Sequence, residues 1–167
     1  MFTKSIAAIT AMACTVSTHA QYTIKSPRGI VSGVSASRIE STDLPKQRLE
    51  QIKAQTFATL DVAAHASDVR TSPGKQTMAI STHTACFDTF LHTEGDYSFI
   101  LDVGGRQTVV SDHIDLPQGK RTCVTHELYQ QVNFPSQGNF MYTATSKAWT
   151  MTSGVRTASS NAFIIVN

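Results

Sequence analysis

Apolar and polar positions alternate along the C-terminal two thirds of the chain. Successive side chains of a strand point to opposite faces of a sheet, so a period of two predicts strands with one buried face. The pattern is clearest in two segments, where a single parity carries the large apolar residues. These residues are Tyr97, Phe99, Leu101 and Val103 in one segment, and Val124, Leu128, Val132 and Phe134 in the other.

Turn-forming residues separate the strand-like segments. Gly104-Gly105 predicts a two-residue hairpin. Pro-containing turns follow at residues 117–119 and 135–138. Between Thr56 and Val166 the pattern predicts seven strands at the intervals of a sandwich. The predicted fold class is therefore an all-β, seven-stranded antiparallel sandwich.

Two further segments carry predictions about the core. In residues 76–87 we place Met78 and Ile80 on the buried face. The last segment, Ala162–Val166, is apolar at every position. Such a run predicts a central strand.

The residues before the sandwich predict an extended arm and one short helix. Leu44–Gln55 is the helix, with Asp43 as its cap and Pro45 in its first turn. Gln21–Asp43 contains many Ser residues together with Pro27, Gly29 and Gly33, which predicts an extended arm. The chain then divides into residues 21–55, the arm and helix, and 56–167, the sandwich domain.

A short apolar run in the arm has the alternation of a strand. Its apolar residues are Ile30, Val31 and Val34. An unpaired sheet edge is a template for another strand, so we expect this segment to add to an edge of its own domain or of a neighbour. A disordered spacer is the alternative.

Residues 1–20 have the features of a secretory signal peptide. Lys4 supplies the positive charge, an apolar stretch follows, and Thr18-His19-Ala20 is a small-x-Ala cleavage site. The apolar stretch is too short to span a bilayer. We therefore expect a secreted or periplasmic protein, cleaved after Ala20.

Two other interpretations of this leader remain open. Cys14 would be the lipidated residue of a lipoprotein, although Ala11-Met12-Ala13 before it lacks the usual large aliphatic residue. Cleavage after Thr18 would leave His19 at the N-terminus, where copper monooxygenases use such a residue as a metal ligand. Signal peptidase disfavours Thr at that position, which favours Ala20.

Composition narrows the possible partners. Charged residues are 16% of the chain and the formal net charge is +2. Without a basic stripe, nucleic acid is not an expected partner. Two cysteines, Cys86 and Cys123, remain after signal cleavage, and in an oxidising compartment such a pair predicts a disulfide. Cys86 shares the parity of Met78, whereas Cys123 opposes Val124, so the bridge needs a bulge or a place at the sheet end.

The densest polar cluster in the sequence is Asp112-His113-Ile114-Asp115. It has the chemistry to coordinate Ca²⁺ or to pair an acid with a base. However, Asp next to a turn is also favoured for local hydrogen bonding, and we expect that role here. The five histidines after the leader show no paired spacing, so we interpret them as surface residues, and no metal or cofactor is expected.

Trp149 is the only tryptophan and a candidate aromatic platform for a sugar. Its parity is opposite to that of Phe140 and Tyr142, so the three rings do not share one strand face. A lone Trp is typically a core anchor, and we expect Trp149 to be buried.

Residues 56–167 resemble immunoglobulin-like and fibronectin-like domains. The closest local match is a strand, a Pro/Gly turn and then Gly-Asn-Phe-Met-Tyr at Gly138–Tyr142, where these domains often have Gly-x-Tyr or Gly-x-Phe. Cys86 and Cys123 are not on the strands that carry the antibody disulfide. The resemblance therefore implies a fold and no specific family.

Together these features favour a non-catalytic protein of binding or assembly. No nucleophile elbow, zinc-protease motif or phosphate loop is present, so we expect no catalytic residue. The expected partner is another protein, or a second copy bound through a sheet edge; a small-molecule ligand is left open. The alternatives are a pilin-like subunit that assembles by strand addition, a copper enzyme using His19, and a hydrolase using the Asp112 cluster.

Overall fold

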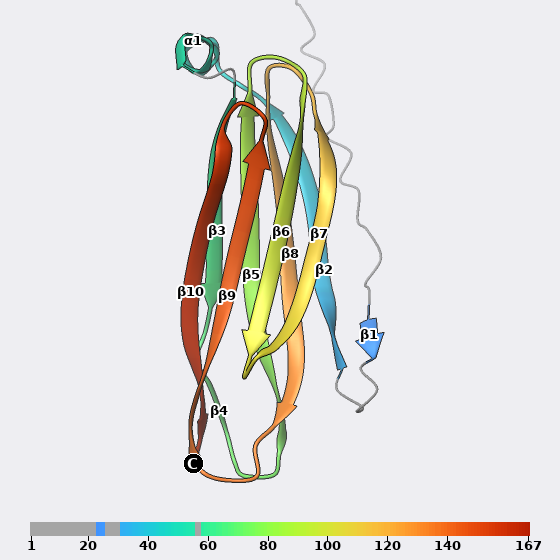
Figure 1. The fold of residues 1–167 in the computed structure, drawn as a ribbon, viewed down its shortest axis with the longest axis vertical. Coiled ribbons are helices and arrows are strands. Elements are labelled where there is room, and N and C mark those ends of the chain that lie inside the picture. The colour runs from blue at the N-terminus through green and yellow to red at the C-terminus, as the bar shows by residue number, and fades with distance from the viewer. Residues whose placement is uncertain (1–22, 26–30, 56–57) are drawn as a thin grey trace, which may run out of the picture.

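The computed structural model describes residues 23–25, 31–55 and 58–167. They form two five-stranded sheets packed face to face, with one helix at an end (Figure 1). The all-β sandwich is confirmed, but the count of seven strands is wrong. The leader, with Cys14, His19 and Ala20, lies outside the described residues, as does Ile30. The strands are β1 (Thr23–Lys25), β2 (Val31–Asp43), β3 (Ala58–Ala66), β4 (Val69–Thr71), β5 (Gln76–Thr89), β6 (Thr93–Val103), β7 (Arg106–Leu116), β8 (Lys120–Asn133), β9 (Gly138–Thr150) and β10 (Gly154–Val166).

The first sheet has the order β1-β2-β8-β5-β3 and the second has the order β4-β10-β9-β6-β7. All neighbours are antiparallel except β4 and β10, which run parallel. The predicted hairpin at Gly104-Gly105 joins β6 to β7, and both glycines have positive φ, 61° and 80°. This left-handed conformation is the one that a tight two-residue turn requires.

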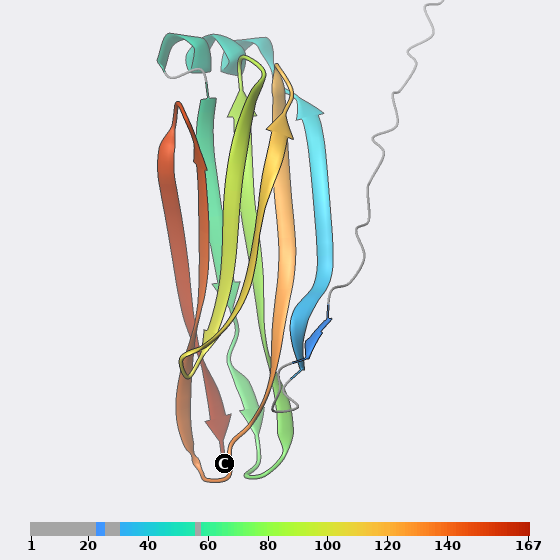
Figure 2. The ribbon, with the colours of Figure 1, turned by 45° about the vertical axis from the view of Figure 1, so that its right-hand side comes forward.

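The segment expected to be an extended arm supplies a full strand of the first sheet. β2 pairs with β8 from Ser32↔Gln130 to Asp43↔Lys120. A register shift between Val34 and Ala36 inserts one extra residue. Because of this bulge, Val34 and Ile39 both pack against the core despite their opposite parity. The bulge interrupts the alternation of apolar and polar residues, so the sequence pattern did not predict that β2 is a long strand of the sandwich. Figure 2 shows β2 running along the sandwich.

The core lies between the two sheets. Tyr97, Phe99, Leu101 and Val103 of β6 are at most 4% exposed, as the alternation predicts. The sheets come close together at Gly95, where an added Cβ would lie 2.9 Å from side-chain atoms of both Leu116 and Phe87. A glycine is therefore the residue that fits at this contact.

The predicted buried face of β5 is wrong. Met78 and Ile80 are 47% and 38% exposed, whereas Ser81 and His83 are almost completely buried. The polar residues tolerate burial because they bond to each other: His83 Nε2 lies 2.8 Å from Ser81 Oγ. On this strand, the hydrogen-bonded polar residues face the core and the more hydrophobic Met78 and Ile80 face outward.

The last strand is also not the central strand of its sheet. Ala162, Ile164 and Val166 are at most 2% exposed, but Phe163 is 42% exposed. On one side, the neighbour of β10 is the three-residue strand β4. Among the described residues, no second layer packs on the outer face of β10 at Phe163. The strand is thus near the edge of the sheet instead of central.

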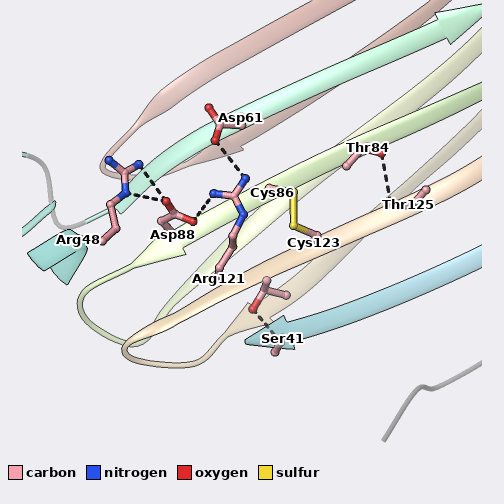
Figure 3. Close-up of a disulfide and its surroundings, with 10 residues drawn as sticks. Ser41, Arg48, Asp61, Thr84, Cys86, Asp88, Arg121, Cys123 and Thr125 are labelled. Atoms are coloured by element: carbon pink, nitrogen blue, oxygen red, sulfur yellow. Dashed lines mark hydrogen bonds and ion pairs between the residues drawn. A yellow bond between two sulfur atoms is a disulfide. The ribbon is translucent and has the colours of Figure 1, made fainter. Parts of the chain in front are cut away.

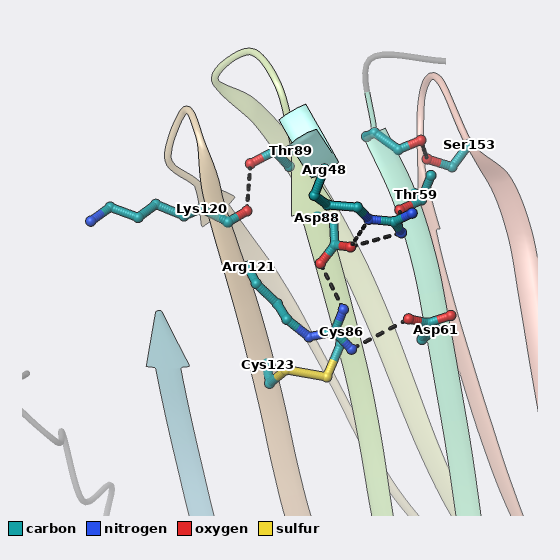
Figure 4. A network of polar contacts seen from close by, with 11 residues as sticks. Arg48, Thr59, Asp61, Cys86, Asp88, Thr89, Lys120, Arg121, Cys123 and Ser153 are labelled. Carbon is teal, nitrogen blue, oxygen red and sulfur yellow. Dashed lines mark hydrogen bonds and ion pairs between the residues drawn. A yellow bond between two sulfur atoms is a disulfide. The ribbon is translucent and has the colours of Figure 1, made fainter. Parts of the chain in front are cut away.

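The predicted helix is present as α1 (Lys46–Gln55) and covers one end of the sandwich. Ile52 is completely buried, and Arg48 Nε donates a 2.9 Å hydrogen bond to Asp88 Oδ2 of β5 (Figure 4). Arg121 of β8 bonds to the other oxygen, Asp88 Oδ1, at 2.8 Å. The buried carboxylate of Asp88 thereby holds the helix against the first sheet.

The predicted disulfide is confirmed. Cys86 and Cys123 are direct cross-strand partners on β5 and β8, and their Cα atoms are 4.1 Å apart (Figure 3). Both face outward from the first sheet, as Met78 does. The parities of the two cysteines agree, because the face of β5 that carries Met78 and Cys86 points outward and not to the core. The bridge therefore needs no bulge. Within the described residues, no helix is long and apolar enough to cross a membrane.

Candidate functional site

One cross-strand row on the outer face of the second sheet brings together two separate predictions from the sequence. Trp149 of β9 is paired with Asp96 of β6, and Asp96 is paired with His113 of β7. On the other side of Trp149 its partner is Val155 of β10. Adjacent strands lie about 4.8 Å apart, so Trp149 and His113 are separated by roughly 10 Å of sheet.

We call this region the Trp149 face. It lies at the end of the sandwich where α1 is found, because β9 ends and β6 begins there (Figure 1). Its outward-pointing members are Trp149, Val155, Glu94, Asp96, His113 and Asp115.

The expected burial of Trp149 is wrong. Its side chain is 36% exposed, because its neighbours Ala148 and Thr150 take the inward positions of β9. Val155 beside it is 66% exposed, and Met151 in the following turn is 99% exposed. In the described part of the chain, no aromatic ring stacks on Trp149. The indole and its apolar neighbours are thus accessible to a ligand.

The other two rings of the suggested platform are elsewhere. Tyr142 is 1% exposed in the core. Phe140 stacks on Phe134, with ring centroids 3.9 Å apart. Parity alone had separated them from Trp149, and the structure agrees.

His113 lies between two carboxylates. Its Nδ1 is 2.9 Å from Asp96 Oδ1, and its Nε2 is 3.4 Å from Glu94 Oε2. The hydrogen bond with Asp96, together with the charges of Asp96 and Glu94, raises the pKa of His113 against a smaller opposing effect of desolvation. The exposed imidazole is therefore held in its charged form to higher pH than a free histidine.

The Asp112-His113-Asp115 cluster does not act as one unit. Asp115 points outward and its Oδ1 lies 2.6 Å from His92 Nε2. Asp112 has the other parity and accepts a 2.8 Å hydrogen bond from the backbone N–H of His113. Burial, and to a smaller extent the nearby charge of Asp112, raise the pKa of Tyr97 to about 12. Among the described residues, no group of three or more His, Cys, Asp or Glu side chains is placed to hold a metal ion.

A second polar cluster lies inside the sandwich, and the interpretation of its histidines as surface residues is wrong. His83 and His126 are cross-strand partners on β5 and β8, and both point inward. His83 Nδ1 lies 3.0 Å from Ser146 Oγ, and its ring stacks on Phe99. Burial, and then the proximity of His126, lower the pKa of His83 to about 4.

The sequence did contain a signal for one member of this cluster. His126 has the parity of Val124 and Leu128, which are completely buried. The contact between His83 and Ser146 has the elements of a nucleophile and a base. Both residues are 0% exposed, however, so no substrate reaches them.

No protein-family model matches the chain. No curated protein matches it either. Solved structures do show a distant likeness. One is the CARDB domain of a protein from Pyrococcus furiosus in complex with di-metal ions, at 12% identity and a TM-score of 0.42, covering 67% of this chain and 97% of that one. Another is the PapD-like domain of human CEP192, at 9% identity and a TM-score of 0.37, covering 64% and 84%. At these values the likeness extends to neither a family nor a function.

Proposed function

We propose that the protein is a non-catalytic binding protein that acts outside the cytosol, and that its recognition surface is the Trp149 face. The observation that carries the proposal is the row Val155–Trp149–Asp96–His113, which places an exposed indole beside oriented polar groups. Exposed aromatic residues with polar neighbours are enriched at recognition surfaces.

The location outside the cytosol is supported by two independent features. The leader has the composition of a secretory signal. The Cys86–Cys123 disulfide persists where thiols are oxidised.

The absence of catalysis is supported by the surroundings of the histidines. The exposed His113 contacts carboxylates, and among the described residues no hydroxyl or thiol nucleophile is hydrogen-bonded to it. The Ser146–His83 pair is closed to solvent. Strand addition to a neighbouring molecule has less support, because β2 already pairs with β8 of its own sheet.

Trp149 allows a direct test, because it is the only tryptophan and its fluorescence reports on this face alone. We would titrate the secreted protein with sets of oligosaccharides, peptides and small organic cations, following both tryptophan emission and calorimetry. At least one class is expected to change the emission with saturation, and Trp149→Ala is expected to weaken the calorimetric affinity about tenfold or more.

The matched control is Met78→Ala, which removes an apolar side chain of similar exposure from the outer face of the other sheet. It should leave affinity unchanged. A ligand whose calorimetric affinity is lowered by Met78→Ala and not by Trp149→Ala would place recognition elsewhere and refute the proposal.

A further inference from the structure

We infer that the occupant of the Trp149 face is a basic segment of a partner protein, with an Arg or Lys side chain lying over the Trp149 indole beside Asp96 and Glu94. This inference rests on the proposed function and specifies its ligand. We further infer that His113 is a built-in competitor for the same carboxylates.

The charge of the face selects the sign of the ligand. Glu94, Asp96 and Asp115 point outward from adjacent strands, and their side chains are 70%, 37% and 71% exposed. Glu94 and Asp115 are themselves cross-strand partners. Three carboxylates on two neighbouring strands repel an anionic ligand and attract a cationic one.

The indole adds a second attraction for the same kind of group. A cation within about 6 Å of a Trp ring is drawn to its face, and Arg does so most often. Trp149 and Asp96 are direct cross-strand partners, so one guanidinium or ammonium group can contact both. A carboxylate and an indole side by side thus form a site for a side-chain cation.

The apolar residues indicate that the cation belongs to a peptide. Val155 continues the exposed surface on the side of Trp149 that is away from the carboxylates, and Met151 is exposed in the turn that follows β9. A simple metal ion would leave them uncovered, and the described residues offer no cluster that would bind one. A segment that combines basic and apolar side chains covers both halves of the face.

His113 already occupies the position of a cation between Glu94 and Asp96. The other charged or titratable groups around it are Asp112 and Asp115 on its own strand, His92 ahead of β6, and Lys147 on β9. When His113 is protonated, it neutralises the carboxylates that the ligand needs. When it loses its proton, their charge is available, so affinity for a basic segment should increase as pH rises.

The experiment uses the full secreted chain and three blocked peptides in which valine alternates with arginine, glutamine or glutamate. A neutral oligosaccharide, cellohexaose, is the fourth probe. Binding is followed by Trp149 emission and by calorimetry, at low and high salt, from pH 5 to 9. The arginine peptide is expected to bind at least about tenfold more tightly than the other probes, and more weakly at high salt.

Three variants with matched controls test the residues. Trp149→Ala and Asp96→Asn should each weaken the arginine peptide about threefold to thirtyfold. Met78→Ala and Asp61→Asn, both on the outer face of the first sheet, should not. His113→Gln should remove most of the pH dependence and retain binding at low pH, whereas His65→Gln, an exposed histidine of β3, should keep the wild-type pH profile.

The outcomes separate this inference from the proposed function. If cellohexaose or the glutamate peptide binds best and Trp149→Ala weakens it, the face is a recognition surface but the basic ligand is wrong. Arginine-peptide binding that is insensitive to Trp149→Ala and Asp96→Asn also overturns the inference. If no probe in the wider ligand sets changes the emission of Trp149, the proposed function itself fails.

Discussion

His83 and His126 face each other inside the sandwich, on the adjacent strands β5 and β8 of the first sheet. A buried imidazole is tolerated when it is neutral and hydrogen-bonded, and His83 has Ser81 and Ser146 as partners. Charging it would place an ion between the sheets, next to a second imidazole. The pKa of His83 is accordingly lowered from 6.5 to about 4.

The first prediction is that the protein loses stability in mild acid. Because the folded pKa lies below the unfolded value, the contribution of neutral His83 is complete above pH 6.5 and is lost as pH falls toward 4. The full difference corresponds to about 3 kcal/mol. Urea unfolding at intervals between pH 7.5 and pH 4 measures it.

The variant His83→Gln keeps a polar group that can reach Ser81 or Ser146 but does not titrate. We expect it to lower the free energy of unfolding at neutral pH and to reduce the loss between pH 6.5 and 4 relative to wild type. His65→Gln, on the exposed side of β3, is the control. Equal acid losses for wild type and His83→Gln would show that the pKa of His83 is the same in the folded and unfolded states, which contradicts the lowered pKa.

At the level of the elements, the disulfide connects the two strands at the middle of the first sheet. β5 and β8 pair over their whole length, from Gln76↔Asn133 to Asp88↔Arg121. Beside the bridge, Arg121 joins β8 to Asp88 of β5 and to Asp61 of β3 (Figure 4). Covalent and ionic links therefore gather at the end of the sheet that α1 covers.

The second prediction concerns this bridge. It closes a loop with a sequence separation of 37 residues. Opening it should lower the free energy of unfolding by roughly 3–4 kcal/mol, because the unfolded chain gains conformational entropy. Urea unfolding of the oxidised protein and of Cys86→Ala/Cys123→Ala compares the two states.

Mass measurement after alkylation, without reductant, is the direct control for the bridge. It should detect no free thiol at these two positions in the secreted protein. Two alkylated cysteines in the unreduced sample would contradict the disulfide, whatever the stability of the double variant.

For the whole molecule, the long N-terminal strand β2 completes the sandwich. β2 covers one edge of β8 and brings Val34 and Ile39 to the core. On its other side, β1 pairs only with Val31–Gly33, so most of the outer edge of β2 has no strand beside it in the described structure. β2, from the segment expected to be an arm, is therefore a strand of the first sheet.

The third prediction is that the protein requires this strand to remain monomeric. A chain starting at Leu44 exposes the edge of β8, which is a template for pairing with another copy. We expect lower stability and association that increases with concentration, measured by sedimentation. In the full chain, the amides of β2 that bond to β8 should be protected from hydrogen exchange to the same extent at all concentrations.

A truncated chain that stays monomeric and equally stable would contradict this role. Protection of β2 that rises with concentration would instead indicate pairing between chains. Exchange at the unstructured rate throughout β2 would show that the segment is a spacer.

Local patterns in the sequence determined the class of the fold and several of its details. Alternation identified the buried face of β6, the Gly104-Gly105 pair identified its hairpin, and the cysteine count identified the disulfide. Each of these depends on residues close together in the chain or on simple chemistry, so no knowledge of the sheet order was needed.

Only the tertiary structure decided which strands are neighbours and which face of an ambiguous strand is inside. His83 is buried because Ser146, far away in sequence, supplies a hydrogen bond, and this partner cannot be read from β5 alone. Trp149, Asp96 and His113 lie in one cross-strand row because β6 lies between β9 and β7. The alternation of apolar and polar residues predicts which face of its own strand a residue lies on. A surface site also depends on which distant segments pair with that strand, and alternation does not contain this information.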